Sequence, residues 1–176
     1  PPDEGWRQLQ AQLQQTKPTV VLLGYGMASS FAGEAGLPAF EKDLRRLLDV
    51  VQKLEPSPRI VVLSPIPHQS GPAPLPDPQP HNQVLALYSS ALRRIAGERQ
   101  ATFVSLFEGM QGQKFEQPIT DNGIHLNSTG YRLAARLIER GLGWPAGEWE
   151  NSPRAEQLRQ VILRKNEQFF HRSRPA

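Results

Sequence analysis

The sequence contains no cysteine, and its uninterrupted apolar runs are short, as in Val20 to Leu23 and Ile60 to Leu63. The first absence excludes disulfides, thiolate nucleophiles and zinc–thiolate sites. The second argues against a membrane-spanning helix, which needs roughly 20 apolar residues. With 38% hydrophobic and 21% charged residues over 176 positions, the composition is that of a globular chain of about one domain.

The net charge of +3 is unevenly distributed along the chain. Residues 153–176 contain six Arg or Lys and two acidic residues, a net charge of +4, so the remainder sums to −1. Glu156 and Glu167 interrupt this basic tail, and it has no long run of basic residues. A solvated helix face is therefore the favoured interpretation, and no nucleic-acid partner is expected.

Hydrophobic periodicity predicts helices that alternate with strands. The predicted helices lie within residues 3–15, 38–54, 81–95, 128–138 and 158–169, and the predicted strands are residues 19–26, 59–66 and 101–107. The strands lack apolar–polar alternation, so each is expected to be covered on both faces of a parallel sheet. Seven prolines in residues 65–80 predict a long loop. The order favours an α/β domain over residues 1–145, followed by a linker and helical extension over residues 146–176.

The segment ITDNGIHLNSTGY, residues 119–131, carries the sharpest candidate site. His125 follows the third predicted strand, and Asp121 is near enough in sequence to hold one ring nitrogen while the other faces a substrate. Asn122 is an alternative partner for the ring, although it lacks a charge. The competing interpretation is an ordinary loop histidine in a turn rich in Asp, Asn and Gly. Asn127 or Ser128 is expected to cap the helix that follows.

The other two strand ends also carry polar and glycine residues. The segment GYGMASSFAG, residues 24–33, offers backbone N–H groups for an oxyanion, although a tight turn explains its glycines equally. Three serines, Ser29, Ser30 and Ser64, are candidate nucleophiles by position. None lies in a G-x-S-x-G elbow, so each is interpreted as a turn or capping residue.

His68 and His81 flank the proline-rich loop. Their thirteen-residue separation matches no metal motif, and Asp77 is the only carboxylate nearby, so no metal site is expected. The favoured role for His68, His81 and the adjacent Asn82 is to shape the wall of a pocket.

The ordered motifs PTVVLLGYGM, RIVVLSPIPH, FVSLF and TDNGIHLNSTGY make the chain similar to the SGNH (GDSL-type) hydrolase family. The resemblance implies a flavodoxin-like three-layer α/β/α fold and hydrolysis of acyl or acetyl esters, often on carbohydrates, without a metal or other cofactor. It also implies an extracytoplasmic location. Residues 1–17 contain no serine, so the family's first two strands and its nucleophile are expected to lie outside this chain, which alone would then be inactive.

The resemblance places the family's catalytic histidine on His125. The family's aspartate position holds Asn122, with Asp121 one residue earlier, and a one-residue shift within the loop makes Asp121 the favoured orienting residue. The oxyanion block falls on Gly26, Ala28 and Ser29, where Ala28 replaces the family's asparagine. These departures support an alternative function, a catalytically inactive module of this family that binds a glycan or protein partner.

Overall fold

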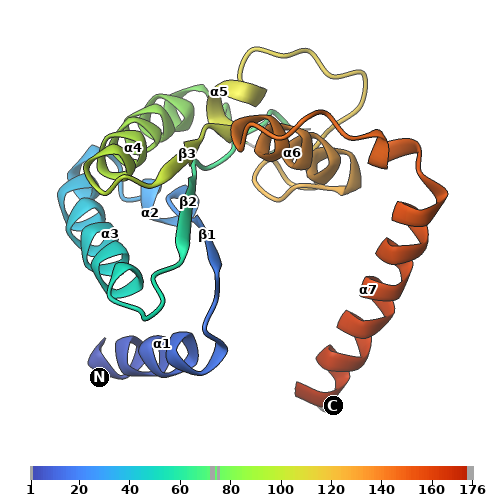
Figure 1. Cartoon of the computed structure of the whole chain (residues 1–176). Coiled ribbons are helices and arrows are strands. Elements are labelled where there is room, and N and C mark those ends of the chain that lie inside the picture. Colours follow the sequence, from blue (N-terminus) through green and yellow to red (C-terminus); the bar gives the residue numbers. More distant parts are fainter. Residues whose placement is uncertain (1, 72–73, 75, 174–176) are drawn as a thin grey trace. The chain divides into compact units, whose positions relative to one another are not determined.

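The computed structural model describes residues 2–71, 74 and 76–173 (Figure 1). The chain forms two compact units, residues 1–143 and 144–176. The first unit is built on a parallel sheet with the order β1-β2-β3, in which β1 is Val20–Gly24, β2 is Arg59–Leu63 and β3 is Thr102–Val104. Residues 72, 73 and 75 of the expected proline-rich loop lie outside the described residues.

Helices cover both faces of this sheet (Figure 1). On one face, α3 (Leu37–Gln52) and α4 (Gln79–Glu98) bury their apolar stripes against β1 and β2, and α1 (Pro2–Thr16) packs against the same cluster. On the other face, α5 (Leu106–Met110) and α6 (Ser128–Gly141) pack against β2 and β3. The predicted α/β fold is therefore confirmed, and its three layers bring the carboxyl ends of all three strands to one edge of the sheet.

Two details of the predicted strands are wrong. β1 is not covered on both faces, because Leu22 is 51% exposed whereas its neighbour Leu23 is buried. Leu22 pairs with Val61 and shares its face, where the α6 layer covers β2 and β3 and reaches Val20 of β1 but leaves Leu22 exposed. The third strand ends at Val104 instead of continuing to Phe107, because the Ser105 hydroxyl accepts a hydrogen bond from the Glu108 N–H and caps α5.

Two short elements follow β1 at the edge where the strands end. α2 (Met27–Ser30) comes directly after Gly26, and the 3-10 helix η1 (Glu34–Gly36) leads into α3. Gly26 adopts φ +117°, a conformation that L side chains rarely reach, so a glycine is needed for this sharp exit from the strand.

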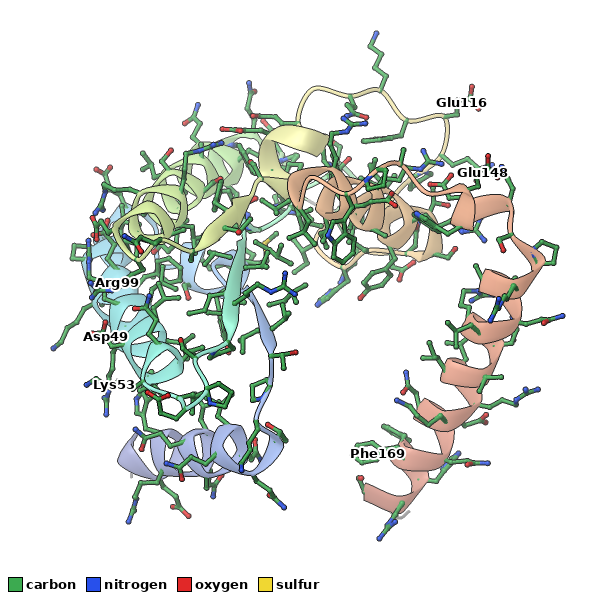
Figure 2. All side chains as sticks on the ribbon, viewed as in Figure 1. Asp49, Lys53, Arg99, Glu116, Glu148 and Phe169 are labelled. Carbon is green, nitrogen blue, oxygen red and sulfur yellow. The ribbon has the colours of Figure 1, made fainter. Side chains whose placement is uncertain are left out.

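The second unit contains the short helix η2 (Glu148–Asn151) and the long helix α7 (Pro153–Ser173). α7 has no buried residue, and several of its large apolar side chains, including Phe169, are exposed (Figure 2). Within the described residues, the helices are too short or too polar to pass through a bilayer.

Candidate active site

The loop that carries His125 is held at both ends by backbone hydrogen bonds. The Asp121 N–H donates to the His125 carbonyl at 2.9 Å, and the Asn127 N–H donates to the Ile119 carbonyl at 3.0 Å. Asn127 also caps α6, because its Oδ1 accepts hydrogen bonds from the backbone N–H groups of Thr129 and Gly130. The loop is thus anchored to the start of a helix, and this confirms Asn127 as the cap residue.

The ring of His125 is contacted by Asn122. Asn122 Oδ1 lies 3.0 Å from His125 Nδ1 and also accepts the backbone N–H groups of Ile124 at 3.3 Å and His125 at 3.0 Å. Those two N–H donors identify the amide atom as oxygen rather than nitrogen. The oxygen can only accept, so His125 Nδ1 carries a proton and Nε2 is left as the basic nitrogen.

Asp121 lies on the same exposed turn but does not make this contact. Among the described residues, no hydrogen bond or ion pair joins its carboxylate to the His125 ring, and its contact with His125 runs through the backbone. The geometry thus favours Asn122, the alternative partner in the sequence, over Asp121. A carboxylate would stabilise the imidazolium by charge, whereas the amide orients the ring without that charge.

The proposed oxyanion segment spans Gly26, which precedes α2, and Ala28 and Ser29 of α2. Ala28 and Ser29 are exposed, and the Ser29 carbonyl accepts a hydrogen bond from the Tyr88 hydroxyl at 3.1 Å. Tyr88 also lies 3.1 Å from the Gly33 carbonyl, and burial of this side chain raises its pKa above the usual 10. α4 therefore fixes the segment after β1 through a phenol that the sequence pattern marks only as an apolar position of a helix.

Two of the three serines considered as nucleophiles have structural roles. Ser64 is 2% exposed, and its hydroxyl donates to the Pro65 carbonyl and accepts from the Phe107 N–H. Ser30 is 1% exposed and donates to the Met27 carbonyl at 2.7 Å. Neither hydroxyl contacts His125, and this agrees with their interpretation as turn or capping residues.

The structure brings His68, His81 and Asn82 together. His68 Nδ1 lies 3.0 Å from His81 Nδ1, and Asn82 binds the His68 backbone twice, accepting from its N–H at 2.7 Å and donating to its carbonyl at 2.8 Å. His68 and Asn82 line a cleft of about 380 Å³ with Asp77 and Met110. Burial, followed by the charge of His68, lowers the pKa of His81 below 6.5.

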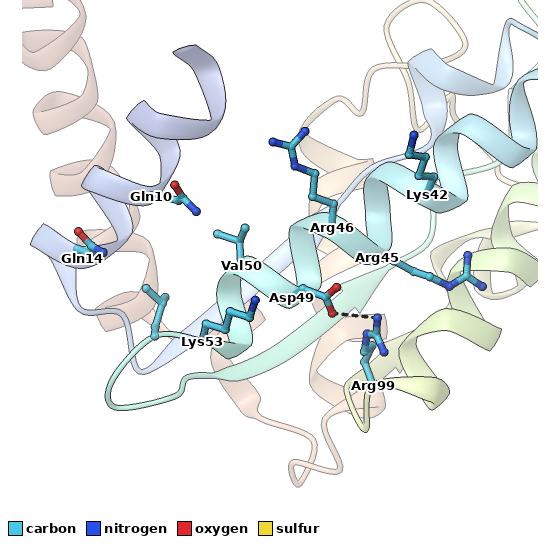
Figure 3. A pocket seen from close by; sticks show the side chains of 10 residues that line it. Gln10, Gln14, Lys42, Arg45, Arg46, Asp49, Val50, Lys53 and Arg99 are labelled. Atoms are coloured by element: carbon cyan, nitrogen blue, oxygen red, sulfur yellow. Dashed lines mark ion pairs between the residues drawn. The ribbon is translucent and has the colours of Figure 1, made fainter. Parts of the chain in front are cut away.

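Metal ligands do not gather at this edge of the sheet. Within the described part of the chain, no three His, Asp or Glu side chains are close enough together to hold an ion. A second hollow, shown in Figure 3, lies between α1 and α3 and contains Lys42, Lys53 and the Arg99–Asp49 ion pair, but no candidate site residue.

The fold and the histidine loop together define a class, an α/β protein with a parallel sheet and a candidate acid–base histidine in the loop between α5 and α6. The family model of the GDSL-like lipase/acylhydrolase family matches residues 3–133. The chain belongs to this family. No match was found among curated proteins.

Solved structures show the same fold at low sequence identity. An acetylxylan esterase from Geobacillus stearothermophilus, solved as a catalytic mutant, is 18% identical with a TM-score of 0.60, and the match covers 79% of this chain and 68% of the esterase. A gut microbial diltiazem-metabolizing enzyme matches at 18% identity and a TM-score of 0.65, over 79% of this chain and 37% of that one. A peptidoglycan O-acetylesterase matches at 20% identity and a TM-score of 0.61, over 76% of this chain and 39% of that esterase.

Proposed function

We propose that this chain carries the acid–base part of an ester-hydrolase site and acts on acyl or acetyl esters. The 3.0 Å contact between Asn122 Oδ1 and His125 Nδ1 supports this proposal most directly, because it leaves Nε2 free to take a proton from an attacking hydroxyl. Two of the structural neighbours are esterases that remove acetyl groups from polysaccharides, and this favours a carbohydrate ester as the substrate.

In the proposed reaction, a serine outside this sequence attacks the acyl carbonyl while His125 Nε2 accepts its proton. His125 then returns the proton to the departing alcohol, and a water activated in the same way releases the acyl group. The oxyanion would be met by backbone N–H groups of the segment that contains Gly26, Ala28 and Ser29. Because Ala28 offers no side-chain donor, this hole lacks a contribution of about 3 to 4 kcal/mol that one such donor typically makes.

The test is hydrolysis of p-nitrophenyl acetate by a form of the protein that includes the serine-bearing segment. His125→Ala should lower kcat/KM by about 1,000-fold or more, since the general base is lost. Asn122→Ala should lower it about tenfold, and Asn122→Asp should raise it by adding a charge that stabilises the imidazolium.

Asp121→Ala is the matched control on the same turn and should change kcat/KM less than about twofold. A large loss in Asp121→Ala together with little loss in Asn122→Ala would instead assign the orienting role to Asp121. Full activity in His125→Ala would overturn the role proposed for His125.

A second function, binding of a glycan or protein partner without hydrolysis, is favoured by two departures from the family pattern. The chain has Ala28 where the family has a donor, and an amide where the family has a carboxylate. This alternative predicts that acetylated xylo-oligosaccharides bind without turnover and that His125→Ala leaves their dissociation constant unchanged. Isothermal titration calorimetry, with product analysis of the same samples, separates the two functions.

A further inference from the structure

A continuous line of polar contacts runs from α2 to the proline-rich loop. Ser30 Oγ lies 2.7 Å from the Met27 carbonyl oxygen and 2.8 Å from His81 Nε2, and His81 Nδ1 lies 3.0 Å from His68 Nδ1. Phe31 stacks on the His81 ring with centroids 4.2 Å apart. None of these side chains has a role in the reaction proposed above.

The carbonyl at one end fixes where the protons lie. The Met27 oxygen can only accept, so the single proton of the Ser30 hydroxyl points toward it. His81 Nε2 must then donate to Ser30 Oγ. A neutral His81 with its proton on Nε2 has a bare Nδ1, and the contact with His68 therefore requires a proton on His68 Nδ1.

The far end of this line touches the loop of His125. Gly123, two residues before His125, packs against the His68 ring so closely that a Cβ at this position would lie 2.9 Å from His68 Cδ2 and 3.0 Å from Nε2. The Gly123 carbonyl accepts a hydrogen bond from the Gln69 N–H at 2.9 Å. At the near end, Ser30 directly follows Ala28 and Ser29 of the proposed oxyanion segment.

We propose that Ser30, His81 and His68 form a positioning relay that holds α2 and the His125 loop in register, and that the relay is intact only while His81 is neutral. Protonation of His81 on Nδ1 places N–H groups on both Nδ1 atoms, and two donors cannot remain 3.0 Å apart. The inference deepens the proposed function and rests on it, because the two segments held together are its oxyanion segment and its acid–base loop.

The surroundings of His81 supply few competing charges. Ser30 of α2 and Phe31, which follows this helix, are uncharged, and His68 is the ionisable group that faces His81 from the proline-rich loop. Asp77 lines the cleft beside His68, and the loop of His125 presents the uncharged Gly123. Burial and the charge of His68 lower the pKa of His81, so the neutral form of His81 persists into mildly acidic solution.

The proton positions can be measured on this chain by two-dimensional NMR of ¹⁵N-labelled imidazole rings. At neutral pH we expect His81 protonated on Nε2 and His68 protonated on Nδ1. On acidification, the backbone amides of Ser29 and Gly123 should shift together with the His81 titration. A proton on His81 Nδ1 at neutral pH, or amides that do not follow His81, would overturn the relay whether or not the protein hydrolyses esters.

The kinetic arm compares three substitutions in the form that includes the serine-bearing segment. His81→Leu removes both ring contacts and should lower kcat about tenfold to a hundredfold with KM within about twofold, because misplaced catalytic groups cost rate rather than binding. His81→Gln keeps one donor and one acceptor at similar spacing, so we expect kcat within about threefold of the parent protein and loss of the acid-side step due to His81.

His171→Gln on α7 is the matched control and should leave kcat and the pH profile unchanged. Equal kcat in His81→Leu and His171→Gln would refute the coupling of the relay to catalysis. If circular dichroism shows that His81→Leu is unfolded, the test rests on His81→Gln. An acidic limb of the kcat–pH profile identical to that of the parent protein would then refute the proposal. An inactive parent protein refutes the proposed function, whereas the NMR result stands separately.

Discussion

At the scale of single residues, the distance from a glycine to neighbouring atoms decides whether a larger side chain fits at its position. Gly130 in the first turn of α6 lies against the backbone of Ile119, and a Cβ there would be 2.0 Å from the Ile119 carbonyl oxygen. Gly97 near the end of α4 has no atom within 4 Å of the corresponding position. The same residue type therefore has opposite roles at the two sites, and only the contacts distinguish them.

Gly130→Ala should destabilise the protein by about 1–3 kcal/mol, because a backbone oxygen cannot move aside as a side chain can. Gly97→Ala should leave the stability unchanged or raise it by up to about 1 kcal/mol, because alanine is the better helix former. Urea denaturation of the two variants measures the difference. Equal stability of both variants would contradict the packing of α6 on the 119–126 loop.

At the scale of elements, an ion-pair network joins α3 to α4. The Glu41 carboxylate on α3 accepts hydrogen bonds from Arg94 at 2.6 Å and Arg45 at 3.2 Å, and Glu98 on α4 pairs with the same two arginines. The pKa of Glu41 lies below its ordinary 4.5, mainly because its carboxylate is hydrogen-bonded to Arg94. The hydrogen bond to Arg45 lowers this pKa further.

Because the folded state lowers the pKa of Glu41, its stabilising effect is present above pH 4.5 and is lost as the pH falls through the folded value. At pH 7, Glu41→Gln should therefore melt at a lower temperature than the parent protein. This difference in melting temperature should disappear as the pH falls below 4.5. Thermal unfolding between pH 7 and pH 3 checks this. Since the ion pairs are partly exposed, 1 M salt should also reduce the difference in melting temperature. A difference that persists at pH 3 would contradict the stabilising role assigned to the Glu41 carboxylate.

At the scale of the whole molecule, the layers cover the sheet unevenly. α3 and α4 bury Leu23, Ile60 and Val62 on one face, while the α6 layer on the other face covers β1 only in part and leaves Leu22 half exposed. An uninterrupted apolar run indicates that a strand is covered on both faces. A strand at the edge of the sheet is covered on only one face where the helical layer does not extend over it.

Leu22→Glu should therefore change the free energy of unfolding by no more than about 0.5 kcal/mol, as surface substitutions usually do. Leu23→Glu places a charge in the buried cluster and should cost several kcal/mol or prevent folding. Circular dichroism and urea denaturation compare the pair. Similar losses in both variants would show that Leu22 is covered in solution.

Most of the fold could be predicted because its signals are local. The stripe of Leu44, Leu48 and Val51 marks α3, and the apolar run at residues 60–63 marks β2. The end of the third strand could not be predicted in the same way. The apolar residues after Ser105 suit a strand or a helix equally, and the hydrogen bond from Glu108 to the Ser105 hydroxyl decides for α5.

By itself, the sequence determined the order of the elements, the family and the loop that carries His125, since each depends on residues near one another in the chain. Only the tertiary structure decided that Asn122 rather than Asp121 contacts the ring, because the turn sets which side chain points at Nδ1. It also decided that Ser30 and His81, 51 positions apart, are joined. Such contacts arise only when the layers pack and bring the carboxyl ends of parallel strands to one edge.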